Sequence, residues 1–109
     1  NGLFSFKIGH DTFKIPCKNI LWFESIDRKV KLVGINREDV FYGNLDEIEQ
    51  ELLKHQFLRI HRSYLINYFH VTRFKYTEVT MSNNITLPIS QLKQKIVRNL
   101  QSEWDMKRG

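Results

Sequence analysis

The sequence predicts one mainly β domain with one or two short helices, and three observations support this. Short apolar segments rich in β-branched and aromatic residues recur along the 109 residues, separated by polar turns. The clearest helical pattern is short and begins at Asn44. Apolar residues make up 41% of the chain and charged residues 27%, which suffices for the core of a single folded domain.

Strands are expected through the first 42 residues. Residues 3–8 partly alternate between apolar and polar, and Gly9-His10-Asp11 supplies a hairpin turn into residues 12–15. Pro16 ends that strand because it has no N–H for a ladder. Further strands are expected at 20–26, 30–35 and 40–42, with polar turns at 27–29 and 36–39.

A helix is expected to follow. Asn44 is a good N-cap, and Glu47 can reach back to complete a capping box. Leu45, Ile48, Leu52 and Leu53 fall on one helical face, which we expect to be buried.

β character returns after the helix. Residues 57–60 and 64–67 flank a polar triplet, and more strands are expected at 71–76, 78–81 and 85–87. Asn83 and Asn84 favour a hairpin turn, because Asn tolerates a positive φ.

A last helix is expected after Pro88, with Ser90 as its cap. Its apolar stripe has a spacing of four residues, and residues 105–109 are expected to fray. The stripe consists of Leu92, Ile96, Leu100 and Trp104.

The charge pattern favours an anionic partner. Seventeen Lys and Arg against 12 Asp and Glu give a net charge of +5. Between Leu52 and Ser102, Glu78 is the sole acid against eight basic residues. No apolar run suits a membrane helix, the N-terminal residues do not resemble a signal peptide, and the single Cys17 suits a reducing cytoplasm. We therefore expect a cytoplasmic protein.

No catalytic, metal or cofactor site is predicted. The possible metal ligands lack paired spacing, Cys17 has no implied His partner, and no glycine-rich phosphate loop occurs. The ligands considered are His10, Cys17, His55, His61 and His70. We expect a protein that is not an enzyme and carries no cofactor.

Three polar clusters are candidate binding loops. The densest runs from Arg59 to Tyr64 and includes His61, Arg62 and Ser63, whose side chains can bind phosphate or guanine. A second contains Arg28, Lys29 and Lys31, and a third contains Ser90, Gln91 and Lys93. Each could equally be a solvated turn when taken alone, but three such loops on a β scaffold favour a binding function.

Four segments together resemble the LytTR family of DNA-binding domains. The most specific is Phe57-Leu58-Arg59-Ile60-His61-Arg62-Ser63-Tyr64-Leu65-Ile66-Asn67. The others are Ile20-Leu21-Trp22-Phe23-Glu24-Ser25, Phe41-Tyr42-Gly43-Asn44-Leu45 and Leu87-Pro88-Ile89-Ser90. The resemblance covers roughly residues 4–100, so the chain is expected to be a single LytTR-type domain over residues 1–109.

This resemblance implies an elongated β-sandwich-like fold and sequence-specific binding of double-stranded DNA. It implies that loops enter successive major grooves at paired direct repeats, and that the three clusters above carry the contacts. Arg62 is expected to be the main base reader, on guanine, and Gln91 the second; Arg59 and His61 are expected to be partly structural. Val30 falls at or beside a position that can hold a base-reading His in the family, so Arg28, Lys29 or Lys31 is expected to substitute.

The resemblance also implies a place in a bacterial two-component transcription regulator. An upstream receiver domain is expected in the full-length protein, and the domain is expected to be a monomer that pairs on DNA. Two other interpretations remain open from the sequence: an RNA or single-strand binder, which the 13% aromatic content permits, and a non-catalytic protein-interaction module.

Overall fold

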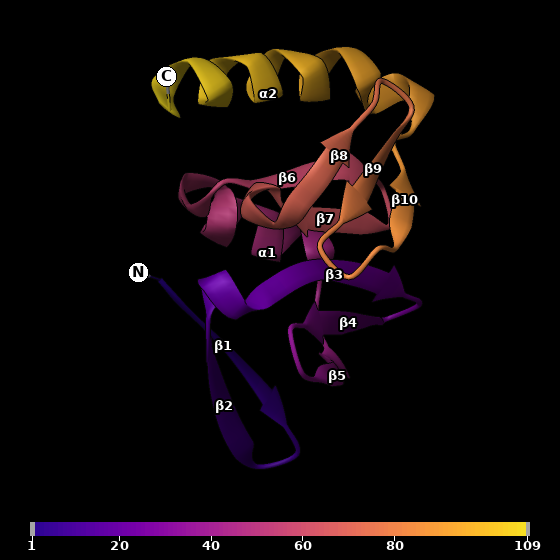
Figure 1. Ribbon diagram of the computed structural model, residues 1–109. Helices are drawn as coiled ribbons and strands as arrows, with labels where there is room; N and C mark the ends of the chain where they lie inside the picture. The colour runs from indigo at the N-terminus through magenta and orange to yellow at the C-terminus, as the bar shows by residue number, and fades with distance from the viewer. Residues whose placement is uncertain (1, 109) are drawn as a thin grey trace.

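A computed structural model describes residues 2–108 and shows an elongated, mainly β molecule of 41 × 29 × 25 Å (Figure 1). Its centre is a five-stranded antiparallel sheet in the order β5-β4-β3-β7-β6. The strands of this sheet are β3 (Ile20–Ile26), β4 (Lys29–Gly34), β5 (Glu38–Tyr42), β6 (Phe57–His61) and β7 (Tyr64–Asn67). The mainly β class expected from the sequence is confirmed.

The central sheet is buried on both faces, which gives the molecule two hydrophobic clusters. In β3, Phe23 belongs to one cluster and Trp22 to the other, since neighbouring side chains in a strand point to opposite faces. Leu65 and Ile66 in β7 divide in the same way. Opposite-facing apolar neighbours explain why residues 20–23 read as a continuous apolar run rather than an alternating one.

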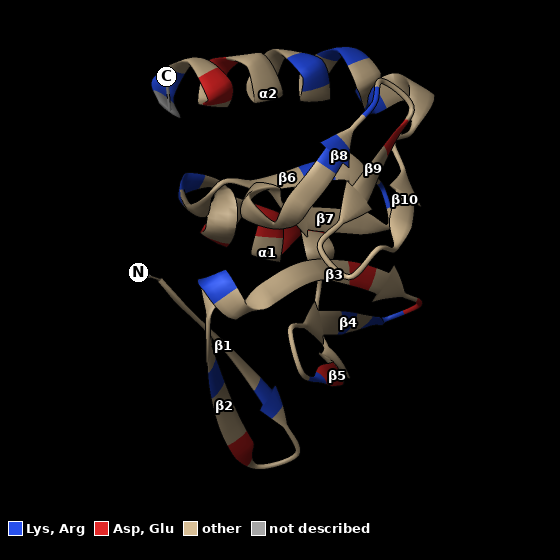
Figure 2. Ribbon diagram, viewed as in Figure 1, with Lys and Arg blue, Asp and Glu red and all other residues tan. Residues whose placement is uncertain are grey.

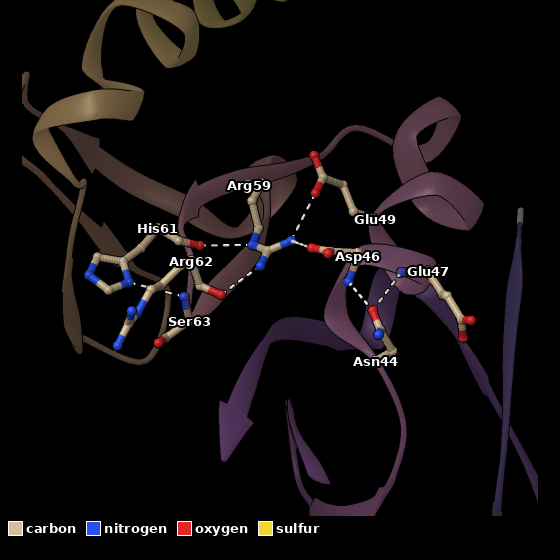
Figure 3. Close-up of polar contacts among 8 residues, drawn as sticks. All are labelled: Asn44, Asp46, Glu47, Glu49, Arg59, His61, Arg62 and Ser63. Carbon is tan, nitrogen blue, oxygen red and sulfur yellow. Dashed lines mark hydrogen bonds and ion pairs between the residues drawn. The ribbon is translucent and has the colours of Figure 1, made fainter. Parts of the chain in front are cut away.

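One face is covered by the hairpin β1 (Leu3–Ile8) and β2 (Asp11–Pro16) and by helix α1 (Leu45–Leu52). Gly9 forms the hairpin turn at φ 62°, as expected. Asn44 caps α1, because its Oδ1 accepts hydrogen bonds from the backbone N–H groups of Asp46 (2.8 Å) and Glu47 (3.2 Å). The Glu47 side chain points away from Asn44 (Figure 3), so the cap forms without the reciprocal bond of a capping box.

The other face is covered by a three-stranded sheet and helix α2 (Figure 1). The sheet order is β10-β9-β8, formed by β8 (Val71–Phe74), β9 (Glu78–Met81) and β10 (Thr86–Pro88). The turn between β9 and β10 contains Asn84 at φ 67°, as the sequence predicted. Helix α2 (Gln94–Arg108) packs through Val97 and Trp104.

The structure corrects the expected register of the last helix. Leu92 and Ile96, expected in its buried stripe, are 91% and 55% exposed. Val97 is buried together with Trp104, because the cluster formed by β6, β9 and β10 meets the neighbouring face of the helix. Ser90 precedes a short 3-10 helix, η4 (Gln91–Lys93), and its side chain makes no capping hydrogen bond.

Two smaller expectations were also wrong. Leu53 is 48% exposed, since α1 ends at Leu52 and the chain continues as the 3-10 helix η2 (Leu53–His55). The tail expected to fray is helical through Arg108, and Gly109 lies outside the described residues. No helix in the described part of the chain has the length and apolarity needed to cross a membrane.

Candidate nucleic-acid interface

The first predicted cluster lies at the tip of the β3–β4 hairpin, where acidic and basic residues occur together (Figure 2). Asp27 adopts φ 55°, a left-handed conformation that Asp tolerates and that closes the tight turn. Arg28 and Lys29 are exposed, and the Lys29 ammonium lies 5.0 Å from the centre of the Tyr42 ring. This hairpin therefore presents two cations at the end of the central sheet.

The second cluster forms the two-residue turn between β6 and β7. Arg62 is exposed, and its side chain points away from Arg59 (Figure 3). The backbone N–H of Ser63 donates a 3.0 Å hydrogen bond to Nδ1 of His61, whose ring lies 5.4 Å from that of Tyr64. The turn thus holds His61 in place and leaves Arg62 projecting from it.

The third cluster begins where the chain leaves β10. The backbone N–H of Ser90 donates to the carbonyl oxygen of Ile60 at 2.9 Å, and the N–H of Lys93 donates to the carbonyl of Ser90 at 2.9 Å. Gln91 is exposed and Lys93 is half-buried. The first bond holds the start of η4 against β6, directly before the turn that carries Arg62, and the second lies within the η4 turn.

Backbone hydrogen bonds fix the three clusters side by side. The N–H of Ser25 donates to the carbonyl oxygen of Ser63 at 2.9 Å, which joins the first loop to the second. The Ser90–Ile60 bond joins the second loop to the third. Backbone bonds between ordered strands hold their ends rigidly, so the loops share one edge at a fixed spacing.

A polar cleft of about 410 Å³ lies between the first and second loops. Four cationic side chains and two carboxylates line it, so positive charge prevails. These residues are Arg28, Lys29, Arg59, Arg62, Asp27 and Asp46. An opening of this charge suits a polyanion better than an apolar ligand.

Arg59 is placed differently from its neighbours in the motif. Its side chain is only 11% exposed and is held by two carboxylates and two carbonyl oxygens. The carboxylates are those of Asp46 and Glu49 on α1, and the carbonyls are those of His61 and Arg62 (Figure 3). The structural character that the sequence suggested for Arg59 is therefore confirmed.

Lys31 is less available than Arg28 and Lys29, the other basic residues of its cluster. It lies within β4, two residues beyond the hairpin tip, and its Nζ is 3.3 Å from Oε1 of Glu38. The Lys31 side chain is 30% exposed. The structure does not bring Lys31 into the cleft between the loops.

Sequence reasoning missed two exposed apolar side chains beside the first loop. Tyr42 is 77% exposed at the end of β5, and Ile26 is 40% exposed at the end of β3. Both line a shallow groove with Arg28 and Lys29. The sequence does contain a signal for Tyr42: an aromatic residue lies at the end of the strand expected at 40–42, directly before Gly43.

The aromatic residues do not form a stacking platform. Most lie in the two cores, including Phe23, Phe57 and Trp22. The exposed ones are Tyr42, Phe69 and Tyr76, and they lie on different segments: β5, the 3-10 helix η3 (Tyr68–His70) and the turn between β8 and β9. Within residues 2–108, no group of three or more His, Cys, Asp or Glu side chains could hold a metal ion.

Comparison with known proteins identifies a matching family. The family model described as the LytTr DNA-binding domain matches residues 10–102. No curated protein matches the sequence.

A solved structure has a similar fold. It is described as the LytTr DNA-binding domain of a putative methyl-accepting/DNA response regulator from Bacillus cereus. The two chains are 23% identical, with a TM-score of 0.79, and the similarity covers 93% of this chain and 97% of the other.

Proposed function

Because this chain belongs to the LytTr DNA-binding domain family, we propose that it binds double-stranded DNA sequence-specifically as the output domain of a bacterial two-component transcription regulator. The observation that carries the proposal is the row of three polar loops, fixed at one edge by the Ser25–Ser63 and Ser90–Ile60 hydrogen bonds. A rigid row of loops can contact a duplex at several places with a smaller loss of backbone conformational entropy on binding than flexible loops would have.

Arg62 is the main base reader in this proposal. Its guanidinium makes no hydrogen bond or ion pair with any other described residue, so its donors are free for the O6 and N7 acceptors of guanine. Gln91, exposed at the start of η4, is the second base reader in this proposal, on adenine.

Most of the remaining predicted residues set the register on the phosphate backbone, and one of Arg28, Lys29 or Lys31 also reads a base in place of the histidine that the resemblance implies. Arg28, Lys29 and Lys93 supply positive charge, and the hydroxyls of Ser63 and Ser90 supply hydrogen bonds. Lys31 contributes less than Arg28 or Lys29, because Glu38 already pairs with it.

Three finer features belong to the same proposal. The loops occupy successive major grooves, one domain binds each half of a direct repeat, and an upstream receiver domain controls pairing on DNA. Pairing on adjacent repeats would raise affinity through effective concentration, without new contacts between DNA and protein. Such a domain has no catalytic role.

The experiment that tests the proposal is selection of bound duplexes from a random library by wild type and by Arg62→Ala. We expect wild type to enrich paired repeats, and the variant to lose about 1–3 kcal/mol of discrimination at one base position. Single-stranded DNA and RNA of the same sequence serve as competitors. A lack of enrichment, or equal competition by single strands, would contradict the proposal.

A further inference from the structure

We infer that Arg59 is a positioning residue for DNA recognition: it contacts no DNA, and instead fixes the β6–β7 turn that presents Arg62. This inference rests on the proposed function and adds a role that the predicted contact residues do not include.

The contacts of Arg59 join two parts of the chain. Its Nη1 lies 2.7 Å from Oδ1 of Asp46 and 2.9 Å from Oε1 of Glu49, both on the first turns of α1. Its Nε donates to the carbonyl oxygen of His61 at 2.8 Å, and its Nη2 donates to that of Arg62 at 2.6 Å. Figure 3 shows the guanidinium between the helix and the turn.

Four of the five N–H donors of the guanidinium are used in these bonds. The planar fork is rigid, so bonds on both sides fix the distance between α1 and the carbonyls of His61 and Arg62. A lysine at this position would keep the charge but would offer a single ammonium, which cannot reach all four acceptors in the same geometry.

Helix α1, which Arg59 contacts on the side opposite the turn, is itself held in place by the core. Leu45 and Ile48 of α1 are buried in the core, and Asn44 caps the helix. The turn between β6 and β7 is therefore tied to the core through α1 and Arg59, in addition to the backbone bonds Ser25–Ser63 and Ser90–Ile60.

The same contacts account for an acid beside the proposed DNA surface. Asp46 is 81% exposed in side chain and lines the cleft with Arg28 and Arg62. An unpaired carboxylate there would repel phosphate. The ion pair with Arg59 reduces the repulsion between the Asp46 carboxylate and phosphate. Through the same ion pair, Asp46 helps to position Arg62.

The test is a double-mutant cycle with Arg59→Lys and Arg62→Ala. The measured quantity is the selectivity ratio, the affinity for the selected duplex divided by that for a scrambled duplex of equal length. Because Arg59 acts through the base contact of Arg62, its replacement can cost no more than the loss of that contact, so we expect Arg59→Lys to lower the ratio about ten- to a hundredfold. Affinity for the scrambled duplex should stay within about twofold of wild type, because net charge is unchanged.

Non-additivity separates positioning from a general loss of structure. If Arg59 acts through Arg62, then adding Arg59→Lys to Arg62→Ala should lower the ratio by no more than about a further twofold. The matched control is Arg37→Lys, which alters the ion pair of the exposed Arg37, in the turn at the opposite end of β4, with Asp39 of β5. Its ratio should equal that of wild type.

Three outcomes would overturn the inference. Arg59→Lys could leave the ratio at the wild-type value, or its loss could add in full to that of Arg62→Ala. If Arg59→Lys fails to fold, the double variant Asp46→Asn, Glu49→Gln decides, and an unchanged ratio there overturns the inference. A wild type with no preference among duplexes would instead remove the proposed function, and the role of Arg59 with it.

Discussion

The backbone N–H of Ser63 donates a hydrogen bond to Nδ1 of His61, at 3.0 Å. Nδ1 can accept this bond only in the neutral ring that carries its hydrogen on Nε2. The ring is therefore held in one tautomer, and we propose that its Nε2–H donates to an acceptor on DNA.

This tautomer can be measured by two-bond ¹⁵N–¹H correlation spectroscopy of the imidazole. We expect Nδ1 of His61 to be unprotonated and Nε2 to carry hydrogen. His61→Ala should weaken binding to the selected duplex by about 1 kcal/mol, the net value of one hydrogen bond. A hydrogen on Nδ1 would contradict the bond to Ser63.

Asn67, the last residue of the most specific motif, is a structural residue. It is buried at 2% exposure, its Nδ2 donates to the carbonyl oxygens of Cys17 and Ile20, and its Oδ1 accepts from the N–H of Phe69. Asn67→Ala should lower the free energy of unfolding by about 1–3 kcal/mol, because buried polar groups lose their partner.

Urea unfolding measures this loss, and Asn36→Ala is the control. Asn36 is exposed in the β4–β5 turn, so its removal should change stability by no more than about 0.5 kcal/mol. Equal stabilities for the two variants would show that the bonds of Asn67 contribute nothing.

Cys17 links stability to pH. The thiol is buried, and burial raises the pKa of Cys17 above its ordinary value. The folded protein then holds its thiol proton more tightly than the unfolded chain. The stabilisation is present below the unfolded pKa of about 8.5 and is lost as pH rises through the folded pKa.

The test compares urea unfolding of wild type and Cys17→Ala between neutral and alkaline pH. The stability of wild type relative to the variant should fall as pH rises above the ordinary thiol range. Iodoacetamide should also alkylate the folded protein far more slowly than the unfolded one. A relative stability independent of pH would contradict the buried, protonated thiol.

Two residues of the apolar stripe expected from the sequence, Trp104 in α2 and Leu92 in η4, should differ sharply in mutational effect. Trp104 is 7% exposed and packs with Tyr68 at a ring-centre distance of 5.4 Å, whereas Leu92, just before the helix, is 91% exposed. Trp104→Ala should lower the free energy of unfolding by about 3–5 kcal/mol, and Leu92→Ala should change it by no more than about 0.5 kcal/mol. Thermal unfolding of both variants checks this, and comparable losses would restore the register expected from the sequence.

Local patterns predicted the elements of this fold but not all of their packing. The turns at Gly9 and Asn84 and the cap at Asn44 depend on neighbouring residues, and the sequence located all three. The face of α2 was missed because two apolar stripes overlap in its sequence. Which one is buried depends on the surface that β6, β9 and β10 present, not on helical spacing.

The candidate site was likewise predictable from the sequence only in part. The three loops could be recognised from their residue types and from the family resemblance. The placement of the three loops side by side depends on bonds such as that between Ser25 and Ser63, which are far apart in the chain. The partners of Arg59 likewise lie 13 and 10 residues away on another element, so its bonds with Asp46 and Glu49 could not be read from spacing.

We propose that the three loops together form the surface that contacts duplex DNA. The most direct test of this proposal is backbone amide chemical-shift mapping of the ¹⁵N-labelled protein titrated with the selected duplex. We expect the largest shifts in the three loops, at Arg28, Lys29, Arg62, Ser63, Gln91 and Lys93, and small shifts at the opposite end, in residues 34–37 and 53–56. Shifts concentrated at that opposite end or along the β1–β2 hairpin, with the loops unchanged, would contradict it.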